Sequence, residues 1–385
     1  MLLRILKPAG ILIIILAGFF VFNTISHASL NNVISFGDMN SFSNPANLCT
    51  ISGSELSMNH YQSISNNAIP AIQFFSNFNG PYFNGNRVDL WLTRNSELNY
   101  WHNNWGFGFN LLEEAHSVSG GDSVRLMQDF KDNSHTVGKI YDIAASGQQE
   151  TKAYLKFYYS TPVEIEAVED LRIGATFNII NGLSYGKVTV TGQASVESAT
   201  TTGFDVDFNT DYNTKDTHGN GYGLDLGASC RVNDRLSLDL ILENVLGEIY
   251  WQNVRNMEAS GDTGTAVVDG DGNITNNPTL SGTEITKNLT ERLAFKSILA
   301  AKYRYSEDLS LLGMIEPYQD LTYYYLGSKW SPSDVYNIDI GYGSRYDSAS
   351  VGIEFPVIKL TLFASDISLS SAKSLGILIS GTVSE

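Results

Sequence analysis

Residues 236–242 read Leu-Ser-Leu-Asp-Leu-Ile-Leu, and this stretch decides the class of fold. Leucine occupies every even position, whereas serine, aspartate and isoleucine occupy the odd ones. Because successive side chains of a β-strand point to opposite faces, this alternation predicts a strand with one continuous apolar face. The opposite face carries Asp239, whose charge needs polar surroundings.

The same period of two recurs along most of the chain. Clear examples are residues 105–111, 204–208, 222–230 and 338–342. In all, about a dozen segments are clear strand candidates, and weaker ones lie at 56–62, 69–78 and 86–94. Strands therefore cover residues 56–385, and no boundary separates a second domain.

Two architectures accommodate so many alternating strands, a water-soluble sandwich and a transmembrane barrel. The residues on the second face discriminate between them. They are often Gly, Ser, Thr, Asn or Tyr, as in residues 321–327, and only 17% of the chain is charged, against about 25% in soluble domains. Tyr and Trp also collect near strand ends, as at Trp105 and Trp330, where a membrane interface favours them.

We therefore predict an all-β fold, a transmembrane antiparallel β-barrel of about 14 strands. In this barrel Leu240 faces lipid and Asp239 faces the lumen. A soluble secreted β protein remains the alternative.

The first 28 residues indicate export. Arg4 and Lys7 form a basic start, the apolar run 11–22 follows, and residues 26–28 offer small side chains for cleavage. This run is shorter than the roughly 20 residues of a transmembrane helix, so residues 1–28 are interpreted as a signal peptide. After its removal we expect a monomer in the outer membrane of a diderm bacterium, in contact with outer-membrane lipid.

Three segments interrupt the strand pattern. Residues 29–55, rich in Asn, Ser and Gly, are expected to form an N-terminal plug or to cross the barrel rim. Residues 112–150 and 252–290 are expected to be long loops, the first with a short helix at 122–130. Residues 56–385 then form the barrel.

The chain also resembles a known family. Residues 42–48, Phe-Ser-Asn-Pro-Ala-Asn-Leu, are similar to the Asn-Pro-Ala segment at the N-terminus of the long-chain fatty-acid transporter superfamily of outer-membrane barrels. Residues 171–177, 221–228 and 236–242 are similar to patterns in uncharacterised members, whose relatives include type IX secretion shuttle barrels and conjugal-transfer-like barrels. The resemblance implies a barrel that binds or passes hydrophobic small molecules, with Asn44, Pro45 and Ala46 gating the lumen.

A second hypothesis is an accessory or docking barrel for protein secretion or surface attachment, whose loops meet a secretion partner. An apolar pocket beneath Asn44 would favour passage of small molecules, whereas a polar, blocked lumen would favour docking. Nucleic acid is disfavoured as a partner, because 24 basic residues face 41 acidic ones.

Catalytic and metal sites are poorly supported, so the chain is not expected to be an enzyme and no cofactor is expected. The six histidines lack metalloprotease spacing, and Gly121-Asp122-Ser123 has no histidine after His218 to act as a base. Asp269, Asp271 and Asn273 resemble the start of a calcium loop but lack its glycine and its final glutamate, so calcium is only a weak possibility. Cys49 and Cys230 could pair if the fold brings them together.

Overall fold

The computed structural model describes residues 44–68, 70–71, 85–131, 136–165, 168–198, 201–262, 266–268, 274–276, 279–318, 321–344 and 347–384. The expected signal peptide and residues 29–43 of the expected plug segment lie outside these ranges. In the described residues no helix has both the length and the apolar character needed to cross a membrane.

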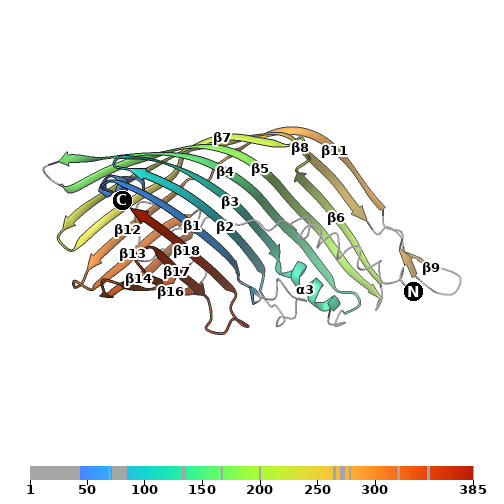
Figure 1. Cartoon of the computed structure of the whole chain (residues 1–385). Helices are drawn as coiled ribbons and strands as arrows, with labels where there is room; N and C mark the ends of the chain where they lie inside the picture. The colour runs from blue at the N-terminus through green and yellow to red at the C-terminus, as the bar shows by residue number, and fades with distance from the viewer. Residues whose placement is uncertain are drawn as a thin grey trace.

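The strands form one closed antiparallel barrel (Figure 1). The ring closes where β1 pairs with β18, from Glu55 opposite Ser384 to Ser65 opposite Ser374. Within the described residues fourteen strands complete the ring, as the sequence predicts. They are β1 (Ser54–Asn66), β2 (Arg87–His102), β3 (Trp105–Gly120), β4 (Ile140–Ile165), β5 (Val168–Ser198), β7 (His218–Asn233), β8 (Leu236–Asp262), β12 (Lys296–Arg304), β13 (Leu309–Tyr318), β14 (Leu321–Ser333), β15 (Tyr336–Gly343), β16 (Ser348–Glu354), β17 (Ile358–Ala364) and β18 (Ser374–Ser384).

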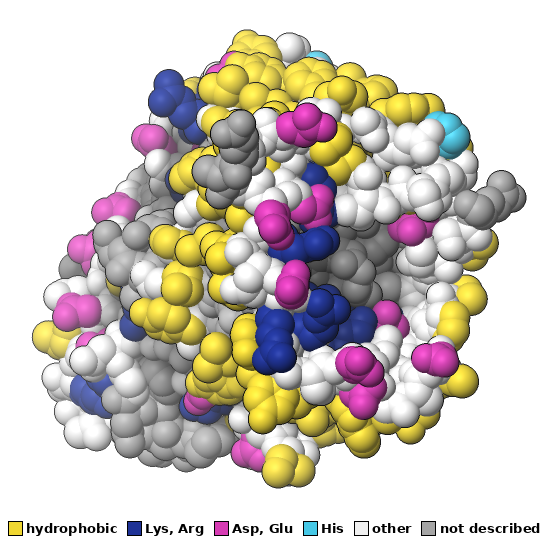
Figure 2. Space-filling model, turned by 90° about the vertical axis from the view of Figure 1, so that its left-hand side faces the viewer, with side chains coloured by type: hydrophobic (Ala, Val, Ile, Leu, Met, Phe, Trp, Pro, Cys, Tyr) yellow, Lys and Arg dark blue, Asp and Glu magenta, His cyan; other side chains and the backbone are white. Residues whose placement is uncertain are grey.

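Apolar side chains cover the outside of the ring. Exposed residues recur at alternate positions on many strands, among them Met58, Phe107, Phe109, Phe157, Phe177, Leu299, Ile340, Val351 and Leu362. Figure 2 views the barrel from the end with the short turns, and yellow apolar side chains gather along its upper margin and at its lower right. A surface of this kind needs lipid rather than water, so the soluble alternative is wrong.

The register expected for residues 236–242 is confirmed. Leu240 is exposed on the outer surface, next to Leu299 of β12, which is also exposed. Asp239 and Ile241 are buried and face the lumen.

This register predicts that Leu240→Arg will sharply reduce the amount of folded barrel. An arginine on the lipid face costs about 2–4 kcal/mol near the membrane midplane. Asp239→Arg places the same charge in the lumen and should leave much more folded barrel, as measured by heat-modifiable gel migration after refolding into vesicles. Equal folded fractions for the two variants would reject the register.

The two ends of the barrel differ. At one end the connections are short, as between β7 and β8, where only Asp234 and Arg235 intervene. The opposite end carries the long connections, including residues 67–86 and 263–278. Long connections at one end and tight turns at the other are typical of outer-membrane barrels.

The two segments expected to be long loops consist mostly of strand and helix, so that expectation is wrong. Residues 112–150 contain the outer parts of β3 and β4, with the helix α3 (Gly121–Lys131) between them. This helix agrees with the one expected at 122–130. Residues 252–290 contain the outer parts of β8 and of β11 (Thr279–Arg292). Apolar alternation is short in these segments, as at Tyr141 and Ile143 of β4, and does not continue along a whole strand.

Further elements lie at the end with the long connections. They are β6 (Thr201–Tyr212), which pairs with β5 and β8, and β9 (Ala266–Val268) with β10 (Ile274–Asn276), which pair with each other. Leu126 of α3 packs with Tyr141 and Ile143 of β4 in a buried cluster.

A hydrogen bond from the Lys139 ammonium to the carboxylate of Asp129 on α3 raises the pKa of Lys139 to about 12.

Candidate functional site

A short helix occupies the barrel lumen near the end with the short turns. This helix, η1 (Pro45–Thr50), is a 3-10 helix that contacts β4, β5 and β7. Asn44, Ala46 and Leu48 are completely buried, and Pro45 is buried as well. The structure therefore places the three residues expected to gate the lumen inside the barrel, directly before β1 begins.

Local chemistry explains why the helix starts here. Asn44 has an extended backbone, with φ −106° and ψ 105°, and its side-chain oxygen accepts a hydrogen bond from the N–H of Ala46. Proline follows at the first helical position, where its missing N–H is not needed. Asn-Pro-Ala is thus a helix start that carries its own cap.

Asp239 of β8 fastens this start to the barrel wall. Its carboxylate accepts hydrogen bonds from the side-chain amides of Asn44, at 2.8 Å, and of Asn47, at 3.0 Å. The Asn44 amide also donates to the backbone oxygen of Ala228 on β7, at 3.1 Å. Hydrogen bonds to an ionised, buried acceptor are among the stronger ones in proteins.

Two glycines make room for the helix. Gly174 of β5 and Gly227 of β7 lie directly opposite each other in the sheet. A Cβ atom at Gly174 would overlap the backbone of Pro45, and one at Gly227 would overlap the Asn44 side chain. This glycine pair was not expected as a functional feature. Glycine within a strand marks a close approach of another backbone, which is the signal that could have found it.

The rest of the helix packs on aromatic rings. Leu48 is buried against Trp101 and Tyr158, whose rings lie 4.5 Å apart. The N–H of Cys49 donates to the Ser160 hydroxyl at 2.7 Å. Both cysteines are free thiols, so Cys49 does not pair with Cys230.

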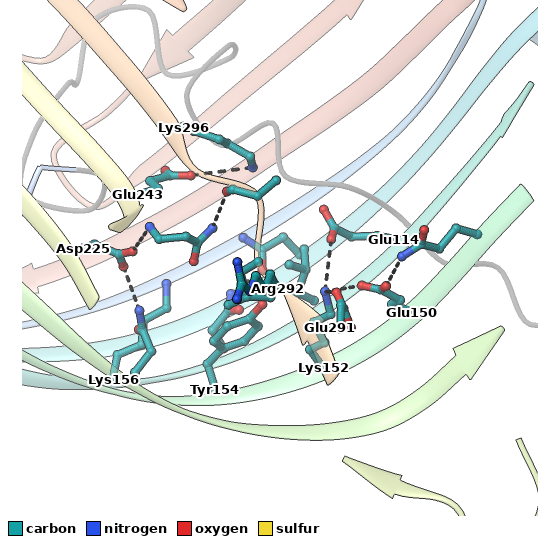
Figure 3. Close-up of a pocket in the computed structure, with 18 of the residues that line it drawn as sticks. Glu114, Glu150, Lys152, Tyr154, Lys156, Asp225, Glu243, Glu291, Arg292 and Lys296 are labelled. Carbon is teal, nitrogen blue, oxygen red and sulfur yellow. Dashed lines mark hydrogen bonds and ion pairs between the residues drawn. The ribbon is translucent and has the colours of Figure 1, made fainter. Parts of the chain in front are cut away.

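A cavity of about 570 Å³ lies beside Pro45, and its walls are polar and charged (Figure 3). At its centre Lys152 is almost fully buried and forms ion pairs with Glu150, with Glu291 at 3.1 Å and with Glu114 at 3.9 Å. The indole N–H of Trp251 donates to the same Glu291 at 2.8 Å. These groups come from β3, β4, β8 and β11, so the ion-pair network ties distant parts of the wall together.

A second charged group lies towards the helix. Lys156 pairs with Glu97 at 3.0 Å, and Asp225 accepts hydrogen bonds from the side chain of Asn178 and the backbone N–H of Asn244. At Asn244 the backbone φ is positive, and here β8 bulges against β7. The cavity beneath the helix is therefore lined by charged and polar side chains together with apolar ones such as Leu112 and Leu293.

The other side of the lumen holds a buried apolar cluster, beside buried charged groups such as the Lys359–Asp339 ion pair. A buried cluster there joins residues of seven strands, with Trp91 and Tyr323 packed against it; its members are Tyr61, Ile241, Ile298, Ala300, Leu312, Met314, Tyr325, Phe363 and Leu378. We call these nine residues the apolar wall. Trp91 also lines the charged cavity and stacks on His116, with ring centroids 3.6 Å apart. It marks the border between the two halves of the lumen.

The calcium candidates Asp269, Asp271 and Asn273 lie outside the described residues, so that site stays a prediction. Among the residues that the structure does describe, no group of histidine, cysteine or acidic side chains has the arrangement of a metal site.

These features define a class of protein: a transmembrane β-barrel in whose lumen the short helix η1, which precedes β1, is seated. No protein-family model and no curated protein matches the sequence. Among solved structures, the chain is similar to a deltaS2S3 mutant of the TodX monoaromatic hydrocarbon channel, with a TM-score of 0.52 and 12% identity over 94% of this chain and 98% of that one. This likeness shows a shared fold.

Other similar structures have lower scores. The toluene transporter TodX of P. putida gives a TM-score of 0.49 and 12% identity, covering 89% of this chain and 93% of that one. A FadL homologue of Pseudomonas aeruginosa gives 0.47 and 11%, covering 93% and 99%.

Proposed function

We propose that this chain is an outer-membrane barrel that binds or passes hydrophobic small molecules. The observation that carries the proposal is the apolar wall, because a lumen that served only polar solutes would not need nine buried apolar residues on one side. The shared fold with a monoaromatic hydrocarbon channel supports the same class of ligand. The ring closes within one chain, which supports a monomer.

In this proposal η1 is the gate. Its end of the barrel carries the short turns, which lie on the periplasmic side in outer-membrane barrels. Asn44, Pro45 and Ala46 close the lumen there, and the contacts with Asp239, Gly174 and Gly227 hold the closed position.

We test the passage of apolar molecules through the lumen by changing Trp91. It is partly buried, packs against the apolar wall and lines the cavity, so its ring lies where the apolar wall and the cavity meet. Trp91→Ala is expected to change uptake of the apolar dye N-phenyl-1-naphthylamine at least threefold in diderm cells whose outer membrane excludes it. Trp330→Ala, which removes an exposed ring from the outer surface, is the matched control and should leave uptake unchanged.

A second candidate function is favoured by the polar cavity. Because the space beneath Asn44 is lined by ion pairs and blocked by η1, the barrel is also suited to act as an accessory or docking barrel for protein secretion or surface attachment. Cells that produce correctly folded protein and take up no more dye than cells without it would reject passage and leave docking.

A further inference from the structure

One strand of the barrel has a free edge. β11 pairs with β8 along one side, from Thr279 opposite Asp262 to Arg292 opposite Glu248. On its other side no described strand pairs with β11. The next strand of the ring, β13, pairs with β12 only from Leu299 onward and does not extend to β11. In Figure 1 β11 lies at the upper margin, where the long strands extend past the shorter hairpins.

The free part of β11 lies in water. All six residues from Ser281 to Thr286 are exposed, whereas strands of the lipid-facing ring alternate between exposed and buried residues. Ile285 is 55% exposed. Both faces and one edge of the strand are therefore open, at the end of the barrel with the long connections.

An edge of this kind presents backbone hydrogen-bonding groups that no described strand pairs with. Every second residue directs its backbone N–H and C=O away from β8, and a strand from Thr279 to Arg292 spans about 46 Å at 3.3 Å per residue. Such unpaired groups are a template for another strand, and proteins usually shorten or cover long edges. The group that fits this edge is the backbone of an extended polypeptide.

Charge selects between possible partners. Six acidic residues and two basic ones lie in the outer parts of β6, β8 and β11, which are residues 205–212, 252–262 and 279–288. The acids are Asp205, Asp207, Asp211, Glu258, Asp262 and Glu284, and the bases are Arg255 and Lys287. Arg255 pairs with Glu284 at 2.9 Å and Lys287 with Asp211 at 2.8 Å, so both bases already have acidic partners. With six acidic residues against two basic ones, this surface is net negative and favours a basic partner.

A second copy of this chain fits poorly. It would bring the same negative surface against itself. Two barrels in one membrane also present β11 in the same direction along the membrane normal, so they could form only a parallel pair, which is slightly less stable per residue than an antiparallel one.

We propose that β11 is a docking edge on which a basic, extended segment of a separate polypeptide adds as a further antiparallel strand. The docking edge lies outside the lumen, so it operates whether or not hydrophobic molecules pass through the barrel.

The test uses the full-length protein in lipid nanodiscs and a twelve-residue peptide in which lysine alternates with threonine and valine. Hydrogen exchange is expected to slow at least tenfold in residues 279–290 when this peptide is added, with no change in β16. Two control peptides should have no effect: one with proline at alternate positions, which cannot form a strand, and one with glutamate in place of lysine. Absence of protection in β11, or equal protection by either control peptide, would overturn the proposal.

Two variants separate edge pairing from surface charge. Residues an odd number apart in a strand direct their N–H groups to opposite edges, so of the two uncharged changes Thr283→Pro and Thr286→Pro one removes a donor from the free edge and the other breaks the pairing with β8. The variant in which the β8 amides stay protected from hydrogen exchange should bind the lysine peptide at least tenfold more weakly than the unchanged protein does. Unchanged binding by that variant would contradict strand addition. Protection of β11 without peptide, together with a dimer in light scattering, would show that a second copy is the partner and would also overturn the proposal.

Discussion

Replacing Lys152 by methionine is expected to lower the free energy of unfolding of the barrel by about 3–5 kcal/mol, the usual cost of removing one partner from a buried ion pair. The Lys152 side chain is only 4% exposed and is the shared counter-ion of Glu114, Glu150 and Glu291. Without it, three carboxylates from three strands repel one another in a space with little water. Urea titration of the protein folded in vesicles, followed by tryptophan fluorescence, measures the change.

Two further variants make the result specific. Lys215→Met removes an exposed lysine from the link between β6 and β7 and should change the free energy of unfolding by less than about 0.5 kcal/mol. Adding Glu150→Gln to Lys152→Met removes one unpaired charge and should restore part of the lost free energy of unfolding. If Lys152→Met costs no more than Lys215→Met, the network does not hold the wall together.

Replacing Gly174 by leucine is expected to drive η1 out of its seat while leaving the barrel closed. The new Cβ would overlap the backbone of Pro45 and the N–H of Ala46, and backbone atoms cannot move aside as a flexible side chain can. A glycine whose added Cβ atom would meet only a side chain, at van der Waals distance, should tolerate substitution. Gly313→Ala is that control, because its nearest neighbour is a Leu326 methyl group at 3.8 Å.

Two measurements report the position of the helix. In a Cys230→Ser background Cys49 is the single thiol, and its labelling by a maleimide is expected to become at least tenfold faster in Gly174→Leu, because the helix that carries it leaves the lumen. Ion conductance through single barrels in planar bilayers should rise in the same variant. A folded Gly174→Leu barrel with unchanged labelling and unchanged conductance would show that η1 does not close the lumen.

The same glycine pair separates the proposed gate from the ion-pair network. Gly174 and Gly227 contact η1, whereas Lys152 lies deeper in the cavity wall. We therefore expect Gly174→Leu to alter labelling with little loss of stability, and Lys152→Met to lower stability with little change in the labelling of Cys49. This contrast assigns gating to the helix and rigidity to the charged wall.

Much of the fold could be predicted from the sequence because its signals are local. A period of two along residues 236–242 requires a strand and assigns Leu240 and Asp239 to opposite faces, whatever the strand pairs with. The helix at 122–130 follows from the spacing of its apolar residues, and α3 is found there. The Asn-Pro-Ala start of η1 is also local, since its cap bonds lie within three consecutive residues.

Pairing between distant segments was decided only by the tertiary structure. Residues 112–150 and 252–290 show no sustained apolar alternation in the sequence, so nothing local distinguishes their long strands from loops. The strands with which they pair hold them extended. Gly174 and Gly227 are far apart in the chain and form one seat only because β5 pairs with β7 in one register. Lys152 likewise meets its carboxylates only when β3, β4 and β11 close around the same cavity. Alternation determines which way a side chain points, but the register and closure of the ring determine what it meets.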